Sequence, residues 1–214
     1  MSDSRPSTLR LILVPSLIAL AINIVRLIGQ REGWFSTASG GGAELVGISW
    51  LSLVFGPWFA WRLRRAGGGP RVERAWLWSL LSLLVLVGVV AWRISGIDRT
   101  ATGDAGFAAL RSNILVIVAA GVPLALLQLV VWPRLALALF AWAALARATV
   151  VVITWIAKTE GWQTHYTKFG QIGIERNLQE TIEAAATAQL GFWVPVAVLS
   201  GTFLGSLLFG RKKA

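Results

Sequence analysis

The sequence predicts an all-α, polytopic integral membrane protein with six transmembrane helices. Of its 214 residues, 56% are hydrophobic and 14% are charged, and the mean hydropathy is +0.67. Soluble domains carry about 25% charged residues, so this chain has too few charges to cover a globule in water. Its apolar residues also fall in long runs, and about 20 such residues in a helix span the hydrocarbon of a bilayer. The six predicted spans cover residues 9–28, 45–63, 75–94, 113–131, 135–157 and 188–210.

The first three spans are separated by glycine-containing segments. Arg5 and Arg10 lie at the start of the first apolar run, which includes Ala19-Leu20-Ala21 and so resembles a signal peptide with its cleavage site. We interpret this run as a retained membrane helix. Glycine-rich segments at 36–44 and 66–74 precede the second and third spans. We interpret both as linkers, because neither has the pattern of a phosphate-binding loop with its lysine.

The last three spans are separated by one tight turn and one long segment. Pro133 favours a break between the fourth and fifth spans. Residues 158–187 form the longest segment outside the membrane, and Ile174, Leu178 and Ile182 recur there every four residues. That spacing predicts an amphipathic helix on the outer face that runs into the sixth span. The whole chain, residues 1–214, is therefore predicted to be a single membrane domain.

The distribution of Lys and Arg predicts the orientation. With six spans, the side that holds both termini carries eleven Lys and Arg against two acidic residues, and the other side carries seven against eight. Because cytoplasmic loops are enriched in Lys and Arg, both termini are predicted to be cytoplasmic. The chain is also Trp-rich. Ten of its twelve tryptophans fall near the predicted interfaces, as amphipathic indoles do, whereas Trp50 and Trp142 are predicted to pack between helices.

One short motif occurs twice. The segments 27–35 and 155–163 share Glu-Gly-Trp, and each lies between an outward and an inward span. Parallel hairpin repeats, as in some transporters, are one interpretation. The other is that glycine ends each helix while tryptophan anchors it at the interface.

Polar residues inside the predicted spans are candidates for function. Ionisable groups within a membrane are functional suspects, and Asn23, Arg26 and Arg147 fall in the outer half. Glu44, at the start of the second span, is a candidate counter-charge. Without such pairing, the guanidinium groups require an anion such as a lipid phosphate, a carboxylate solute or an acidic partner residue. These four residues are the predicted sites for a ligand, anion or partner.

Helix contacts are predicted at three other positions. Gln128, in the fourth span, is a candidate for an interhelical hydrogen bond. Gly201 and Gly205 form a small-xxx-small pair in the sixth span, which permits close packing of another helix.

The segment KTEGWQTHYTKFG, residues 158–170, contains the only histidine and the only tyrosine. A His–carboxylate pair can carry out acid–base chemistry, but no nucleophile motif or second acid accompanies it. We therefore predict no catalytic residue. Trp162, His165 and Tyr166 are predicted instead to form an anchor at the outer surface that offers a docking site.

The composition restricts the classes of function. The chain has no cysteine and a single histidine, so we predict no metal site and no cofactor. Its net charge of +10 lies beside hydrophobic segments, which favours a membrane role over nucleic-acid binding.

The resulting hypothesis is a non-catalytic accessory or scaffold subunit of a larger membrane complex. The alternative is a small transporter, channel or lipid-handling protein. The expected surroundings are the lipid bilayer of the bacterial cytoplasmic membrane and either membrane protein partners or further copies of the chain.

Overall fold

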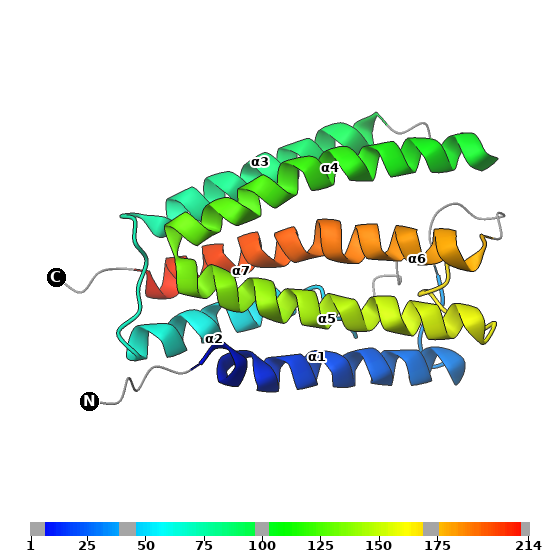
Figure 1. Ribbon diagram of the computed structural model, residues 1–214, viewed down its shortest axis with the longest axis horizontal. Coiled ribbons are helices and arrows are strands. Elements are labelled where there is room, and N and C mark those ends of the chain that lie inside the picture. The colour runs from blue at the N-terminus through cyan, green and yellow to red at the C-terminus, as the bar shows by residue number, and fades with distance from the viewer. Residues whose placement is uncertain (1–6, 39–45, 97–102, 169–175, 211–214) are drawn as a thin grey trace.

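The structure, a computed structural model, describes residues 7–38, 46–96, 103–168 and 176–210. Every regular element in these ranges is helical, as predicted. The elements are α1 (Thr8–Arg31), α2 (Leu51–Arg65), α3 (Ala75–Ser95), α4 (Gly103–Val131), α5 (Pro133–Thr159), α6 (Leu178–Ala186), the π-helix η2 (Thr187–Trp193) and α7 (Val194–Phe209). The helices lie roughly parallel to one long direction, and α1 begins at the end of the bundle where α7 finishes (Figure 1).

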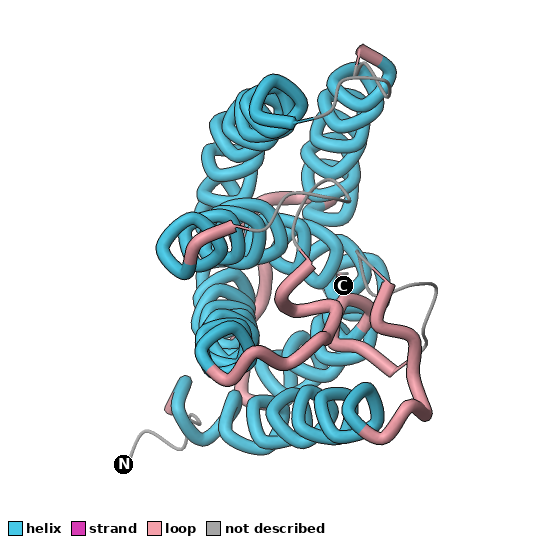
Figure 2. The backbone as a smooth tube through the Cα atoms, turned by 90° about the vertical axis from the view of Figure 1, so that its right-hand side faces the viewer, coloured by secondary structure: helices cyan, strands magenta, loops and turns pink. Residues whose placement is uncertain are grey.

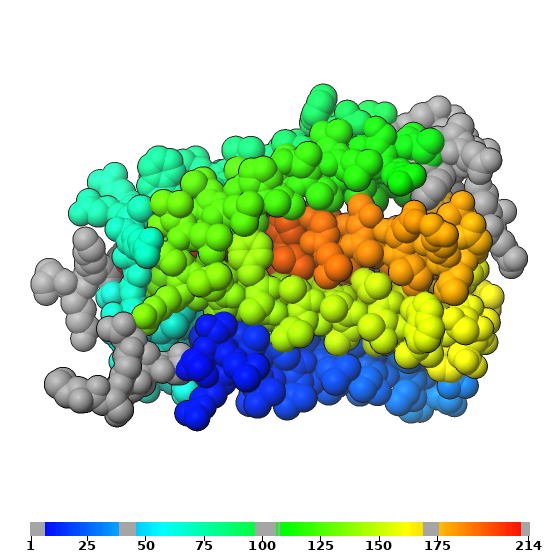
Figure 3. Space-filling view, viewed as in Figure 1, coloured from blue at the N-terminus to red at the C-terminus, as the bar shows by residue number. Residues whose placement is uncertain are grey.

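Among the described residues, five helical segments are long and apolar enough to cross a membrane. They are Thr8–Arg31, Ala75–Ser95, Ala108–Val131, Pro133–Thr159 and Leu178–Phe209. Their outward faces carry large apolar side chains, and Leu13, Leu84 and Val130 are 52%, 54% and 58% exposed. Such surfaces suit contact with hydrocarbon better than contact with water. On the face seen in Figure 3, α1, α5, the α6–α7 segment and α4 lie side by side from bottom to top.

The second predicted span differs from the structure. A helix was predicted over residues 45–63, but α2 covers Leu51–Arg65, and its 15 residues extend about 22 Å, short of the roughly 30 Å of hydrocarbon. Residues 46–50 form bends and a turn instead. A Cβ added to Gly47 would lie 2.9 Å from a terminal nitrogen of Arg26, so the backbone here runs close to that guanidinium. Non-helical backbone at membrane depth is tolerated where protein surrounds it, and Gly47 and Ile48 are buried.

Helix α7 occupies the centre of the bundle. It contacts α2, α3, α4 and α5, and ten of its sixteen residues are buried. Its contact with α2 is close because glycines meet there: a Cβ added to Gly56 would overlap the backbone of Gly201, and one added to Gly205 would lie 2.9 Å from the Gly56 carbonyl oxygen. The Ser52 and Ser200 hydroxyls, 2.9 Å apart, add a hydrogen bond. The close approach predicted for Gly201 and Gly205 is confirmed, with α2 as the partner.

The α3–α4 hairpin extends the bundle to one side, at the top of the end-on view in Figure 2. Only four residues of α3 are buried: Ala75, Ser79, Ser82 and Leu86. Gln128 of α4 is fully buried and links two of them, accepting from the Ser79 hydroxyl at 2.8 Å and donating to Ser82 Oγ at 3.2 Å. The predicted interhelical hydrogen bond of Gln128 is confirmed.

The two Glu-Gly-Trp turns have the same local structure. Gly33 and Gly161 have φ values of +77° and +66°, a left-handed conformation that favours glycine. In each turn the backbone N–H of the tryptophan donates to the carbonyl five residues earlier. The distance is 2.7 Å from Trp34 to Gly29 and 2.8 Å from Trp162 to Ala157. This is a common way of ending a helix. The helical turn therefore accounts for the shared motif without a duplication.

The predicted outer helix runs without a break through η2 into α7, but a different face is buried. Leu178 is 39% exposed, whereas Thr181 is 1% exposed and Ala185 is fully buried. Helix α6 contacts α5, and small residues on the contact face let two helices approach closely. For this reason the predicted apolar stripe through Leu178 and Ile182 does not mark the packed face.

Candidate functional site

Arg147 is the central group of the candidate site. It lies on α5, fourteen residues and about 21 Å from the first residue of that helix, and therefore in the half of the bundle that is farther from the start of α5. It is 5% exposed. A charged group taken out of water costs several kcal/mol unless other groups compensate for the lost hydration.

Three neutral groups surround the guanidinium. Arg147 donates to Gln189 Oε1 at 3.1 Å and to Ser49 Oγ at 3.4 Å, and its Cζ lies 4.8 Å from the centre of the Trp193 ring. Within the described ranges, no carboxylate pairs with Arg147. Among the described residues, dipoles and an aromatic face thus compensate the buried positive charge, and no opposite charge does.

The π-helix supplies two of these three groups. Gln189 and Trp193 both belong to η2, which precedes Pro195 of α7. Proline has no N–H to donate to the carbonyl four residues earlier, here Gly191, and π-helices are frequent at functional sites. Gly191 also packs against Val118 of α4, where an added Cβ would lie 2.9 Å from a valine methyl group. Local widening of the helix thus coincides with the residues that hold Arg147.

The third group comes from the segment that precedes α2. Ser49 lies in the bent stretch 46–50, and Gly47 of the same stretch lies against Arg26. This stretch therefore contacts both arginines, Arg26 on α1 and Arg147 on α5. A continuous helix over 45–63, as predicted from the sequence, would not present the backbone in this way.

Asn23 forms a separate contact. It is 2% exposed and donates to Thr149 Oγ1 at 2.9 Å, which ties α1 to α5 two residues from Arg147. The structure shows no direct hydrogen bond between Asn23 and Arg147. Glu44, the predicted counter-charge, lies outside the described residues.

The loop that follows α5, residues 160–168, packs on the end of α1 near Arg26. His165 Nδ1 lies 2.8 Å from Gln30 Oε1, while Gln30 Nε2 donates to the Ser36 carbonyl at 2.6 Å. Because Gln30 Oε1 can only accept, Nδ1 of His165 carries the proton in this network. The Tyr166 hydroxyl donates to the Asn23 carbonyl at 3.4 Å. These bonds join the end of α5 to α1.

The His165 imidazole and the Tyr166 phenol are both neutral near pH 7. Burial, reinforced by the positive charge of Arg26, lowers the pKa of His165 to about 3. Burial raises the pKa of Tyr166 to about 12, although Arg26 opposes that rise. The neutral imidazole contributes stability fully above pH 6.5, and this contribution is lost as the pH falls from 6.5 toward 3. Neither group therefore changes charge near pH 7, where a general acid or base has to work.

The predicted docking residues differ in accessibility. Tyr166 is 2% exposed, and the Trp162 ring stacks under the Arg31 guanidinium at 4.4 Å. A partner at this surface would meet Trp162 and His165 rather than the tyrosine ring. Gln189, Ser49 and Trp193 were not predicted as site residues. The polar Gln189 within an apolar span was the one signal in the sequence.

No protein-family model matches this chain, and neither a curated protein nor a solved structure shows significant similarity to it. The functional conclusion therefore depends on the geometry of the site.

Proposed function

We propose that this protein binds an anionic group in the outer half of the membrane through Arg147, as a lipid-handling protein or a small transporter. The observation that supports this most is the burial of Arg147 among neutral partners only, within the described ranges. An arginine fork binds carboxylate or phosphate oxygens through paired hydrogen bonds. Because Trp193 covers one face of the guanidinium, an anion would approach along its edge.

The bent stretch 46–50 supports the same proposal. Helix α2 begins inside the bundle rather than at its outer end, next to Ser49 and therefore next to Arg147. In several transporters, broken helices place a positive helix start toward an anionic substrate near the middle of the bilayer. Here the helix start and the two arginines all favour negative charge in one region.

The proposal is tested by thermal unfolding of the purified protein in a nonionic detergent, with oleate and lysophosphatidic acid as carboxylate and phosphate probes. We expect at least one probe to raise the unfolding temperature of the wild-type protein but not that of Arg147→Gln. Arg10→Gln serves as the matched control and should respond like the wild type. It removes an exposed charge at the start of α1, at the end of the bundle away from Arg147. Equal responses from wild type and Arg147→Gln, or none from either, would contradict anion binding at Arg147.

A second proposal is an accessory or scaffold subunit of a larger membrane complex. Helix α3 favours it, because most of its surface lies outside the core and Gly88 is exposed with no atom within 4 Å of an added Cβ. Exposed glycine on a membrane helix permits close approach of another helix. Native mass spectrometry separates the two proposals: stoichiometric co-purification with other membrane subunits supports the scaffold, and a lone monomer or homodimer with a bound anion supports the binding protein.

We also propose that the chain lies in a bacterial cytoplasmic membrane with both termini in the cytoplasm. Helix α1 starts, α2 ends and α5 starts at the same end of the bundle (Figure 1). The helix bounds therefore place at that end Arg10, Arg62, Arg64, Arg65 and Arg134. The excess of Lys and Arg at that end supports this orientation. Helix α2 and the bent stretch before it would then complete the sixth crossing together.

A further inference from the structure

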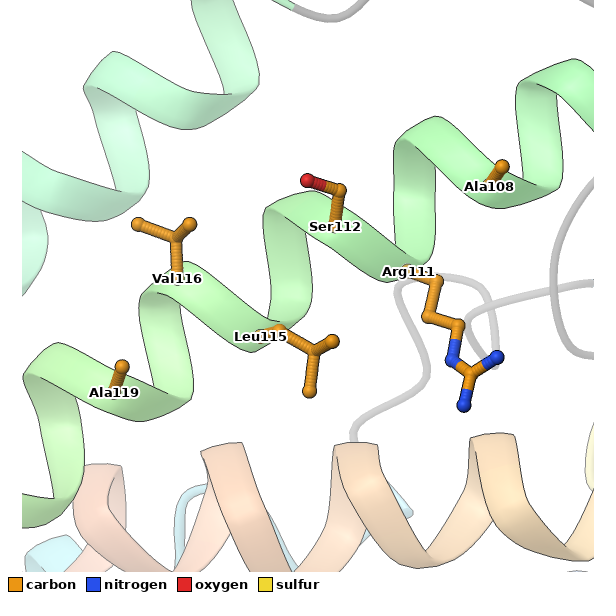
Figure 4. Close-up of a pocket in the computed structure, with 6 residues that line it drawn as sticks. All are labelled: Ala108, Arg111, Ser112, Leu115, Val116 and Ala119. Carbon is orange, nitrogen blue, oxygen red and sulfur yellow. The ribbon is translucent and has the colours of Figure 1, made fainter.

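A groove runs along the outer half of α4. It encloses about 600 Å³ and is lined by Ala108, Arg111, Ser112, Leu115, Val116 and Ala119. This volume lies within the range of about 300–1,000 Å³ that is typical of small-molecule sites. All six side chains are exposed, so no described part of the chain covers the groove. Figure 4 shows Arg111 and Leu115 extending from α4 in the direction of the α6–α7 segment.

The depth of each lining residue follows from its position on α4. Arg111 lies twenty residues before Val131, the last residue of α4, and therefore about 30 Å from the inner end, which equals the hydrocarbon thickness of a bilayer. Its guanidinium thus lies at the level of the outer lipid headgroups. Ala119 lies about 12 Å deeper, so the apolar part of the groove runs through most of one leaflet.

The chemistry changes along the groove in the same order. Arg111 is exposed, and no described side chain pairs with its guanidinium. Ser112 also lines the groove, but its hydroxyl points away from the Arg111 guanidinium (Figure 4), and the deeper residues Leu115, Val116 and Ala119 are apolar. The small side chains of Ala108, Ser112 and Ala119 leave room for the groove. Arg111 supplies a positive charge at the outer end of the groove.

We propose that this groove binds a phospholipid of the outer leaflet, with the phosphate on Arg111 and one acyl chain along Leu115, Val116 and Ala119. Charge and depth together favour this occupant. A soluble anion would leave the apolar part of the groove unused, and an apolar partner helix would cover the Arg111 charge without an acceptor. The site is separate from Arg147; its assignment to the outer leaflet rests on the proposed orientation but not on anion binding at Arg147.

Native mass spectrometry of the full chain, titrated with phosphatidylglycerol in a nonionic detergent, tests the proposal. Arg111→Gln should weaken lipid binding about tenfold, since it removes a charge-assisted contact to phosphate. Arg93→Gln is the control: Arg93 is half-buried near the end of the neighbouring helix α3 and does not line the groove, so its loss should leave the affinity within about twofold.

A second variant tests the apolar part. Ala119→Phe fills the groove without changing its charge and should also weaken binding several-fold. Both altered residues are exposed, so the unfolding temperatures should stay close to that of the wild type. Equal losses in Arg111→Gln and Arg93→Gln, full affinity in Ala119→Phe, or displacement of the lipid by glycerol 3-phosphate would each overturn the proposal.

Discussion

Gly56→Leu is expected to prevent the bundle from folding into a stable monomer. A Cβ at this position would overlap the Gly201 backbone, which cannot move aside as a flexible side chain can. Overpacking by a few methylene groups already costs about 1–3 kcal/mol where side chains alone must adjust. A leucine here must separate α2 from α7, and α7 holds the centre of the bundle through its contacts with four helices. Thermal unfolding and size-exclusion chromatography in detergent measure the effect.

Gly88→Leu is the matched control for this substitution. Gly88 also lies in a membrane helix, but an added Cβ there meets no atom within 4 Å. We expect this variant to remain monodisperse and to unfold within a few degrees of the wild type. Equal stability of Gly56→Leu and Gly88→Leu would show that α2 and α7 do not meet at Gly56 and Gly201.

Arg147→Gln is expected to leave the anion-free protein as stable as the wild type, or to stabilise it. The substitution removes a buried charge and leaves a neutral amide in its place. Replacing buried charges by neutral groups is often neutral or stabilising by about 1–4 kcal/mol. With a ligand at a hundredfold excess over its Kd, the wild type should gain about 2.7 kcal/mol of unfolding free energy, and the variant should gain none.

A double-mutant cycle with Glu44→Gln tests the opposing explanation. If Glu44 neutralised Arg147 within the chain, each single variant would leave one buried charge alone, at a cost of about 3–5 kcal/mol. The double variant would then recover most of that loss. This recovery would show that Glu44 and Arg147 form an internal ion pair, and it would contradict an anion-binding site at Arg147.

Much of the architecture was predictable because lipid contact leaves a simple pattern. Five of the six predicted spans correspond to long helices, since an apolar run of about 20 residues has few alternatives to a membrane helix. The second span was mispredicted at its start. Hydropathy does not show that Gly47 packs against Arg26 or that Ser49 hydrogen-bonds to Arg147. Because of these contacts, the chain bends where the apolar run predicted a helix.

The candidate site was predictable only in part. A charge within a span identifies Arg147, but its partners come from η2 and from the bent stretch before α2, and sequence spacing indicates neither element. Asn23 shares the depth of Arg147 yet bonds to Thr149, because residues at one depth on different helices need not face each other. Tyr166 resembled an interfacial anchor, whereas its ring is buried over α1.

Single-cysteine labelling tests most directly whether the chain crosses the bilayer an even number of times, with α2 returning it to the cytoplasmic side. The absence of cysteine makes single-cysteine labelling with a membrane-impermeant maleimide clean in intact bacterial cells. Thr159→Cys should react from outside, whereas Ser2→Cys, Ala66→Cys and Ala214→Cys should react only after permeabilisation. Labelling of Ala66→Cys from outside, or of the two ends on opposite faces, would contradict this arrangement.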